Sequence, residues 1–393
     1  MRVRRRVKLV VAAILLLTVL LLLLSRSHLC SHSALTTVCA QVEEGLAVGD
    51  MCLDLCHLQT VRPDGCPSYH SGKEVVFSAE FRASLPVMAK ARRLDLEMDS
   101  EHVVYWTANN GTLQFSGLAD FQEALENHLQ INYNVGLKKG LFSLWPHSLH
   151  KESLSEEENA WLRHSSMKNI WTLSLDQEFV FSRLFKEFAV FPEVYGTCGG
   201  LFFVEKLLPL DMPYFLQSVD FGGWVTRVKL ALAILDLLEE FDEMFEFPVY
   251  LCDVKSEHFG LSGEGRVKYL DIDNVFLSPV ADRTLGDGSE CETDADCDLF
   301  DCEGHCHLAQ CRGGRVNSNL AVVCQKIFLA QNLGLKFLGG TGLLLSKHAS
   351  SGLLHTLETC AGMRNVSSEQ RGQVLENLRE QLKEVIYISE QLE

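Results

Sequence analysis

The sequence is short of basic residues. Its 393 residues contain 35 Lys and Arg against 52 Asp and Glu, which gives a formal net charge of −17. Five of the cations lie within residues 1–8, so the rest of the chain carries −22. Nucleic-acid binding depends on cations that neutralise phosphates, and this balance argues against such a partner. The negative charge is compatible with a basic protein partner or divalent cations, but its simplest explanation is that it keeps the protein soluble.

Close cysteine pairs of the C-x2-C type, a common zinc signature, are also absent. The chain nevertheless has 14 cysteines, five of them within residues 30–66 and five within residues 291–311. This content predicts disulfides and an oxidising compartment. Each group holds an odd number, so at least one cysteine in each must pair outside its group, stay free or pair between chains.

The N-terminus predicts a membrane anchor. The basic residues 1–8 precede residues 9–24, which are apolar apart from Thr18. Basic residues before an apolar run hold the N-terminus in the cytosol, so the remaining chain is expected in the lumen, in a single-pass type II topology. The run is short for a span of about 20 residues, which suits a thin early-secretory bilayer. A cleaved signal peptide is the alternative. Sequons at Asn110 and Asn365 would then be glycosylated.

The remaining pattern mixes strands and helices. Alternating apolar residues predict a strand, a turn and a strand over residues 75–90. The acidic residues 94–166 are predicted to be mostly helical. The further predicted elements are a helix over 174–188, two strands around a turn at 196–200, a long helix over 224–245, and helical segments over 321–393.

The most informative strings follow the long helix. Residues 251–259 read L-C-D-V-K-S-E-H-F, and residues 269–273 read Y-L-D-I-D. The kinase catalytic loop reads H-R-D-L-x-x-x-N, and a lysine often stands two residues after its aspartate. Asp253 and Lys255 keep this D-x-K spacing, and Asp271 stands where the D-F-G aspartate belongs. Phosphoryl transfer needs one carboxylate at the substrate hydroxyl and a second that holds Mg²⁺ against the nucleotide phosphates.

With the order of elements, the basic and apolar N-terminus and the cysteine groups, these strings resemble the divergent protein kinase domain 1 family over the whole chain. The resemblance implies a cysteine-rich type II membrane protein of the endoplasmic reticulum. The implied fold class is α+β, a bilobal protein-kinase-like domain with a cysteine-rich stem and insertion behind one N-terminal transmembrane helix. The predicted divisions are a cytosolic tail (1–8), an anchor (9–24), a stem (25–70), an N-lobe (71–210) and a C-lobe (211–393) with its insertion at 285–312.

The resemblance also assigns roles. Lys90, in V-M-A-K, matches the strand lysine that contacts the nucleotide phosphates, and Glu178 matches its ion-pair partner, with Glu187 as competitor. Asp253 is the expected base, and Lys255 would neutralise the transferred phosphate. The simpler alternatives are a surface lysine and acids that cap turns.

The expected metal ligands are Asp271 and His258. The histidine replaces the Asn that binds a second Mg²⁺, and imidazole suits that hard ion poorly. We therefore expect Mn²⁺ or Zn²⁺, or one metal ion in place of two, and reduced or absent transfer. Only Gly72 remains of the glycine-rich phosphate loop, and other residues restrict the approach of the backbone to a phosphate. Cys252 replaces the Arg that couples catalysis to phosphorylation, and a disulfide is its simplest role.

Two segments raise the question of calcium. The insertion interleaves its five cysteines with acids, which fits a disulfide-knotted ordered lid, a Ca²⁺ site, or a zinc site with His305 and His307; the acids are Asp294, Asp296, Asp298 and Asp301. The family is associated with an EF-hand-like N-lobe insertion. Its candidate here, residues 106–117, lacks acids at the first, third and twelfth positions, so we expect no tight Ca²⁺ binding.

Three functions remain open. The first is a lumenal kinase that uses ATP with Mg²⁺ or Mn²⁺ to phosphorylate a secretory protein or glycan. The second is a pseudokinase that serves as a membrane-tethered binding or scaffold module, and the third is a Ca²⁺- or redox-responsive adaptor. Lys90, Asp253 and Asp271 favour the first, whereas His258 and the missing glycines favour the second. Residence in the endoplasmic reticulum is implied by the resemblance alone.

Overall fold

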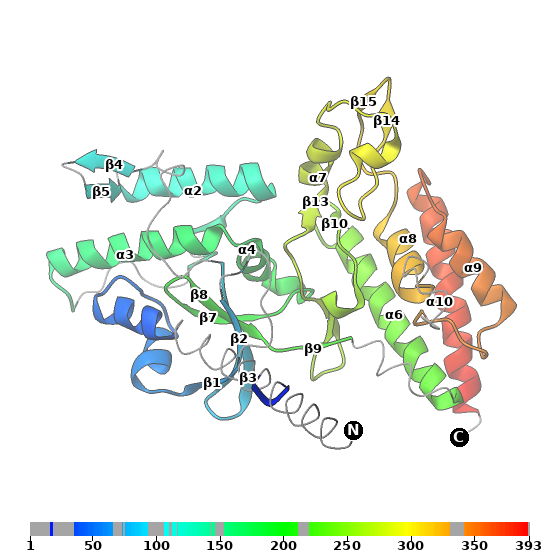
Figure 1. The fold of residues 1–393 in the computed structure, drawn as a ribbon, viewed down its shortest axis with the longest axis horizontal. Coiled ribbons are helices and arrows are strands. Elements are labelled where there is room, and N and C mark those ends of the chain that lie inside the picture. Colours follow the sequence, from blue (N-terminus) through cyan, green and yellow to red (C-terminus); the bar gives the residue numbers. More distant parts are fainter. Residues whose placement is uncertain are drawn as a thin grey trace, which may run out of the picture. The chain divides into compact units, whose positions relative to one another are not determined.

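The chain folds into two compact units (Figure 1). Unit 1 comprises Met1–Asn127, Leu137–Leu184 and Glu193–Lys206, and unit 2 comprises His128–Gly136, Phe185–Pro192 and Leu207–Glu393. The computed structural model describes residues 16–18, 35–65, 73, 75–92, 106–109, 112–115, 117–141, 143–145, 153–210, 220–330 and 342–391.

Unit 1 is built on a five-stranded antiparallel sheet in the order β1-β2-β3-β8-β7. Its strands are β1 Val61–Gly65, β2 Val75–Phe81, β3 Leu85–Ala91, β7 Val194–Cys198 and β8 Leu201–Glu205. The predicted strand, turn and strand are β2 and β3, and the two strands around the turn near 196–200 are β7 and β8. Their apolar side chains form a core in which Phe77, Val87 and Phe203 are fully buried. Burying apolar surface stabilises a fold by about 25 cal/mol per Å².

The cysteine-rich segment packs on this sheet. Val38, Met51 and Leu55 belong to the same apolar core as β2 and β3, and Leu55 lies in the π-helix Leu53–His57. A disulfide joins Cys52 to Cys198 in β7, across a sequence separation of 146 residues. Closing so long a loop restricts the unfolded chain strongly.

The predicted helix over 174–188 is wrong at both ends. Helix α3, Glu156–Ser174, begins at a capping box between Ser155 and Glu158 and runs to the predicted start. Helix α4, Gln177–Leu184, begins where the Asp176 carboxylate accepts the amide hydrogens of Glu178 and Phe179. Aspartate favours this capping position, which separates the helices. A 3₁₀ helix, Lys186–Phe188, follows α4.

The acidic stretch contains strands as well as the predicted helices. Besides α2, Leu118–Tyr133, and the first part of α3, it contains the short strand β6, Lys138–Leu141, and the hairpin of β4, Trp106–Asn109, with β5, Thr112–Phe115. The described residues 106–109 and 112–115 of the candidate EF-hand loop form the two strands of this hairpin. Aromatic and β-branched residues explain the preference for strands. Gly72 and Asn110 lie outside the described residues.

Unit 2 is mainly helical. Its long helix α6, Phe221–Glu243, is capped by Asp220 and buries Trp224 and Leu235. Helix α10, Ser368–Glu390, lies along α6 (Figure 1), where Arg379 contacts Asp236 and Glu239. Further helices of this unit are α7 Ser278–Leu285, α8 Asn319–Val323 and α9 Ser351–Ala361, with 3₁₀ helices Ser256–His258 and Asp294–Cys297 and a π-helix Cys324–Phe328.

Unit 2 also contains short antiparallel strands, which flank the predicted catalytic loop. Strand β10, Val249–Leu251, pairs with β13, Val275–Leu277. Strands β12, β11 and β9 form a second sheet, and β14 pairs with β15 in the insertion. Their bounds are β9 Leu208–Pro209, β11 Phe259–Leu261, β12 Val267–Tyr269, β14 Cys306–His307 and β15 Gln310–Cys311.

The disulfides show that each cysteine group pairs outside itself, which is one of the three alternatives left open by the odd counts. The first group reaches Cys198 through Cys52, and the second reaches Cys252 through Cys302. The other disulfides in the described part of the chain are Cys39–Cys56, Cys291–Cys306, Cys297–Cys311 and Cys324–Cys360. Cys30 and Cys66 lie outside the described residues.

The predicted anchor is largely outside the described residues, which include only 16–18 of its positions 9–24. Among the helices that the structure describes, none has the length and apolar character needed to span a bilayer.

Candidate functional site

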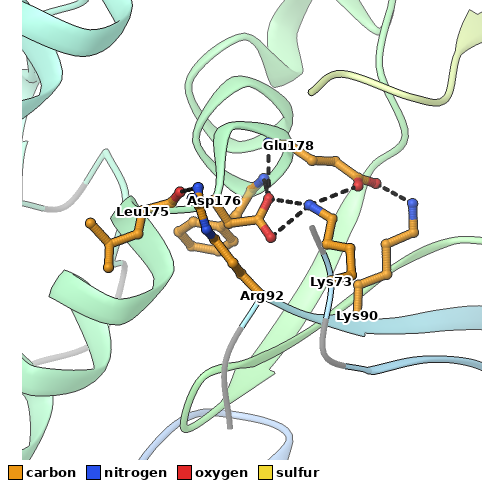
Figure 2. Close-up of polar contacts among 7 residues, drawn as sticks. Lys73, Lys90, Arg92, Leu175, Asp176 and Glu178 are labelled. Atoms are coloured by element: carbon orange, nitrogen blue, oxygen red, sulfur yellow. Dashed lines mark hydrogen bonds and ion pairs between the residues drawn. The ribbon is translucent and has the colours of Figure 1, made fainter. Parts of the chain in front are cut away.

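Unit 1 brings together the predicted lysine and glutamate. Lys90 lies near the end of β3, and its Nζ is 2.5 Å from Oε1 of Glu178 in the first turn of α4 (Figure 2). The glutamate side chain is only 3% exposed, whereas the lysine side chain is 17% exposed. Glu187 lies in the 3₁₀ helix beyond α4. The expected ion pair is thus formed, while its role toward a nucleotide stays a prediction.

The same network contains two residues, Lys73 and Asp176, that were not among the predicted site residues. Lys73 precedes β2, and its Nζ is 2.6 Å from both carboxylate oxygens of Asp176 and 3.4 Å from Oε2 of Glu178 (Figure 2). Its ammonium also lies 5.8 Å from the centre of the Phe202 ring. Two lysines and two carboxylates therefore form a charge-balanced set, which we call the lysine–carboxylate quartet: Lys73, Lys90, Asp176 and Glu178.

The two lysines of the quartet favour the ionised form of Glu178. Burial alone would raise the pKa of Glu178, but the attraction of Lys90 and then of Lys73 outweighs that cost and lowers this pKa from its ordinary value of 4.5. Buried charges are tolerated only when they are paired. A capping signal at Asp176 was readable in the sequence, whereas nothing near Lys73 marks that lysine as buried.

In unit 2, the predicted catalytic loop follows β10 directly. Asp253 is half-buried, and its Oδ2 accepts a hydrogen bond of 2.8 Å from Lys255 Nζ. This hydrogen bond is the main reason why the pKa of Lys255 is raised. The backbone carbonyl of Asp253 accepts a second bond, of 2.7 Å, from the hydroxyl of Tyr269. The loop therefore holds Asp253 by its backbone and leaves its carboxylate beside a cation.

His258 and Asp271 meet at the same loop. Nδ1 of His258 lies 2.8 Å from the carbonyl oxygen of Asp253, and because a carbonyl only accepts, Nδ1 carries the hydrogen. Nε2 lies 3.2 Å from Oδ2 of Asp271; it donates to that carboxylate when the ring is charged and offers a lone pair to a metal ion when the ring is neutral. Ligand atoms about 2.1 Å from one ion and at right angles to each other lie about 3 Å apart. The pair thus fits two neighbouring ligands of one metal ion, and ligand atoms of Asp253, His258 and Asp271 lie within 4.8 Å of one another.

The insertion uses its acids differently. Asp294 accepts the amide hydrogen of Cys306 and contacts His305, and Asp298 accepts that of Gly304. Asp296 caps a short 3₁₀ helix. The one other cluster of potential ligands in the described part of the chain is Cys291, Cys297 and Cys311, whose sulfurs are in disulfides. These contacts favour a disulfide-knotted, ordered insertion.

Comparison with known proteins gives the family. Residues 170–363 match the family model described as the protein-kinase domain of FAM69, and residues 2–143 match that of its N-terminal cysteine-rich segment of the endoplasmic reticulum. The chain belongs to the FAM69 family. This confirms the resemblance to the divergent protein kinase domain 1 family, with a kinase-like α+β fold, and it fits residence in the endoplasmic reticulum.

The chain is also similar to part of a solved structure. The complex of Rv3197 with erythromycin from Mycobacterium tuberculosis matches 56% of this chain at 12% identity, with a TM-score of 0.26. The match spans 46% of that protein's chain. A likeness of this size carries no argument about function.

Proposed function

We propose that this FAM69 protein is a lumenal phosphotransferase of the early secretory pathway, which uses ATP and one divalent metal ion to phosphorylate a secretory protein or glycan. The observation that carries the proposal is the approach of His258 Nε2 to Asp271 Oδ2, at 3.2 Å, beside Asp253. The formed ion pair of Lys90 and Glu178 supports it, because kinases need this pair in place as well as the metal-binding aspartate.

The proposal gives each polar group one task. Asp253 accepts the proton of the substrate hydroxyl, and Lys255 offsets the charge of the phosphate that is transferred. Lys90, held by Glu178, binds the nucleotide phosphates. His258 and Asp271 would hold a metal ion, which supplies positive charge to the phosphates when bound. The chain would reach the lumen through a type II anchor at residues 9–24, and the exposed Asn365 would then be open to glycosylation.

The metal preference is testable at His258. An imidazole nitrogen with a free lone pair favours Mn²⁺ over Mg²⁺, which prefers oxygen. We expect activity with Mn²⁺ to exceed activity with Mg²⁺, and His258→Asn to reverse that preference by restoring an oxygen ligand. Rates measured against the concentration of each ion, for both proteins, check this. A preference for Mg²⁺ in the unmodified protein would show that His258 is not a ligand.

The proposed activity is tested by label transfer. The purified full-length protein is incubated with γ-labelled ATP, Mn²⁺ and a detergent extract of secretory-pathway glycoproteins. We expect label on proteins or on released glycans with the unmodified protein, and none with Asp271→Ala. Absence of label with a folded protein that still binds ATP would contradict transfer and favour the second function.

That second function is a pseudokinase acting as a binding or scaffold module. The lysine–carboxylate quartet favours it, because Lys73 already pairs with Glu178 and the charges balance without a nucleotide. The two functions differ in the fate of ATP. Both allow ATP to bind, but only the first predicts labelled product.

A further inference from the structure

Asp301, in the cysteine-rich insertion, contacts the peptide groups on both sides of Asp253. Its amide donates a 2.7 Å hydrogen bond to the carbonyl of Cys252, and its Oδ2 accepts one of 2.6 Å from the amide of Val254. Asp301 is separated from Val254 by 47 residues in the sequence. One residue of the insertion therefore grips the peptide backbone immediately before and after the proposed base.

Asp301 is itself held on three sides. Lys326 Nζ lies 2.6 Å from the same carboxylate oxygen, and Asn317 Nδ2 donates a 2.9 Å bond to the Asp301 carbonyl. The next residue, Cys302, forms a disulfide with Cys252, and both cysteines are fully buried. The Lys326 side chain is 23% exposed and that of Asp301 is 20% exposed, so their charges are partly withdrawn from water. Charge-assisted bonds of this kind are roughly twice as strong as neutral ones.

We propose that Asp301 is a positioning residue that fixes Asp253 for phosphoryl transfer, so that the catalytic loop is ordered without phosphorylation of the chain. We call Asp301 and its contacts with Cys252, Val254 and Lys326 the Asp301 clamp. The proposal rests on the function proposed above. In kinases that are switched by phosphorylation, a new phosphate orders the activation loop through an arginine. Here a carboxylate supplied by the insertion, with Lys326 as its counter-charge, takes that place.

The disulfide and the clamp have separate roles. The Cys252–Cys302 disulfide fixes where the insertion meets the chain, but it bonds only one neighbour of Asp253. The carboxylate of Asp301 secures the other neighbour, Val254. The Asp253 backbone lies between these two contacts. Its orientation, and so that of the Asp253 side chain, depends on both of them. Small displacements of a catalytic group are costly, since an error of about 1 Å lowers rates about 100-fold.

The test combines hydrogen exchange with kinetics on the full-length protein. For Asp301→Ala we expect the Val254 amide to exchange about tenfold faster or more, because its charged acceptor is gone. The Leu251 amide, which donates to Asn319, should keep its rate. With Mn²⁺ and ATP as probe and water as acceptor, kcat should fall about 100-fold while the KM for ATP is unchanged. Asp301→Asn keeps one acceptor oxygen. Its Val254 exchange rate and its kcat should therefore lie close to those of the unmodified protein.

Asp298→Ala is the matched control, because Asp298 also accepts a backbone amide hydrogen, from Gly304, within the same insertion. It should change neither readout. The proposal is overturned if Asp301→Ala leaves the Val254 exchange rate unchanged, or if Asp298→Ala lowers kcat equally. An unmodified protein that binds ATP but releases no phosphate would refute the proposed function and the catalytic role together. Accelerated exchange at Val254 would then still establish the clamp as a structural contact.

Discussion

Replacement of Lys73 by Met will lower the free energy of unfolding by about 3–5 kcal/mol. The lysine side chain is 6% exposed, and its ammonium is the counter-charge of Asp176, whose side chain is 2% exposed. Met fills a similar volume but leaves that carboxylate buried without its cation. Removing one partner of a buried pair costs far more than an exposed pair contributes, because the remaining charge stays desolvated. Urea unfolding of the purified protein measures the change.

Two further variants separate this effect from a general loss of packing. Lys206→Met removes a lysine whose pairing with Asp64 is exposed on both sides, and it should cost no more than about 1 kcal/mol. Adding Asp176→Asn to Lys73→Met removes the stranded charge and should restore part of the lost stability. Equal effects of Lys73→Met and Lys206→Met would show that the quartet is not buried as described.

Asp253→Asn will reduce phosphoryl transfer by about 10²- to 10⁴-fold, the usual contribution of a general base. The change preserves the shape of the side chain and removes only its charge and proton affinity. The bonds from Tyr269 and His258 go to the Asp253 backbone carbonyl, so they persist in the variant. Binding of ATP should therefore be unaffected while turnover is lost, as kinetics with Mn²⁺ and ATP would show.

Glu257→Gln is the control for Asp253→Asn. Glu257 is an exposed acid in the same loop, and its carboxylate contacts only the neighbouring Ser256 among the described hydrogen bonds. It should retain full turnover. If Asp253→Asn also keeps its rate, Asp253 is not the base, and transfer would have to depend on another group.

The sequence was sufficient to predict features that depend on a few neighbouring residues. The order of strands and helices, the D-x-K loop and the later aspartate were readable because each lies within a few residues. The second helix was predicted to begin at 174, but α4 begins at Gln177, because its apolar pattern starts at Leu175, ahead of the capping residue Asp176. The hairpin of β4 and β5 was missed because acidic neighbours favoured a helical interpretation.

Apart from the pair of Lys90 and Glu178, which the family resemblance supplied, the sequence did not predict contacts between distant residues. Lys73 and Asp176 are 103 residues apart, and a lysine beside a glycine is ordinarily exposed. Asp301 was visible only as one of several acids among cysteines, and its bond to Val254 depends on how the insertion folds back. Odd counts required one cysteine of each group to pair outside it, stay free or pair between chains, and counting alone could neither choose among these nor select Cys198 or Cys252 as the partner.

The central claim is that a nucleotide and a metal ion bind this protein through Asp271. The most direct measurement is the thermal unfolding of the full-length protein with ATP and Mn²⁺, together and separately, for the unmodified chain and Asp271→Ala. At a hundred times its dissociation constant, a ligand stabilises the folded state by about 2.7 kcal/mol. We predict a shift that requires both ATP and Mn²⁺ and disappears in Asp271→Ala. An unchanged unfolding temperature at millimolar ATP, or an equal shift in the variant, would contradict the account.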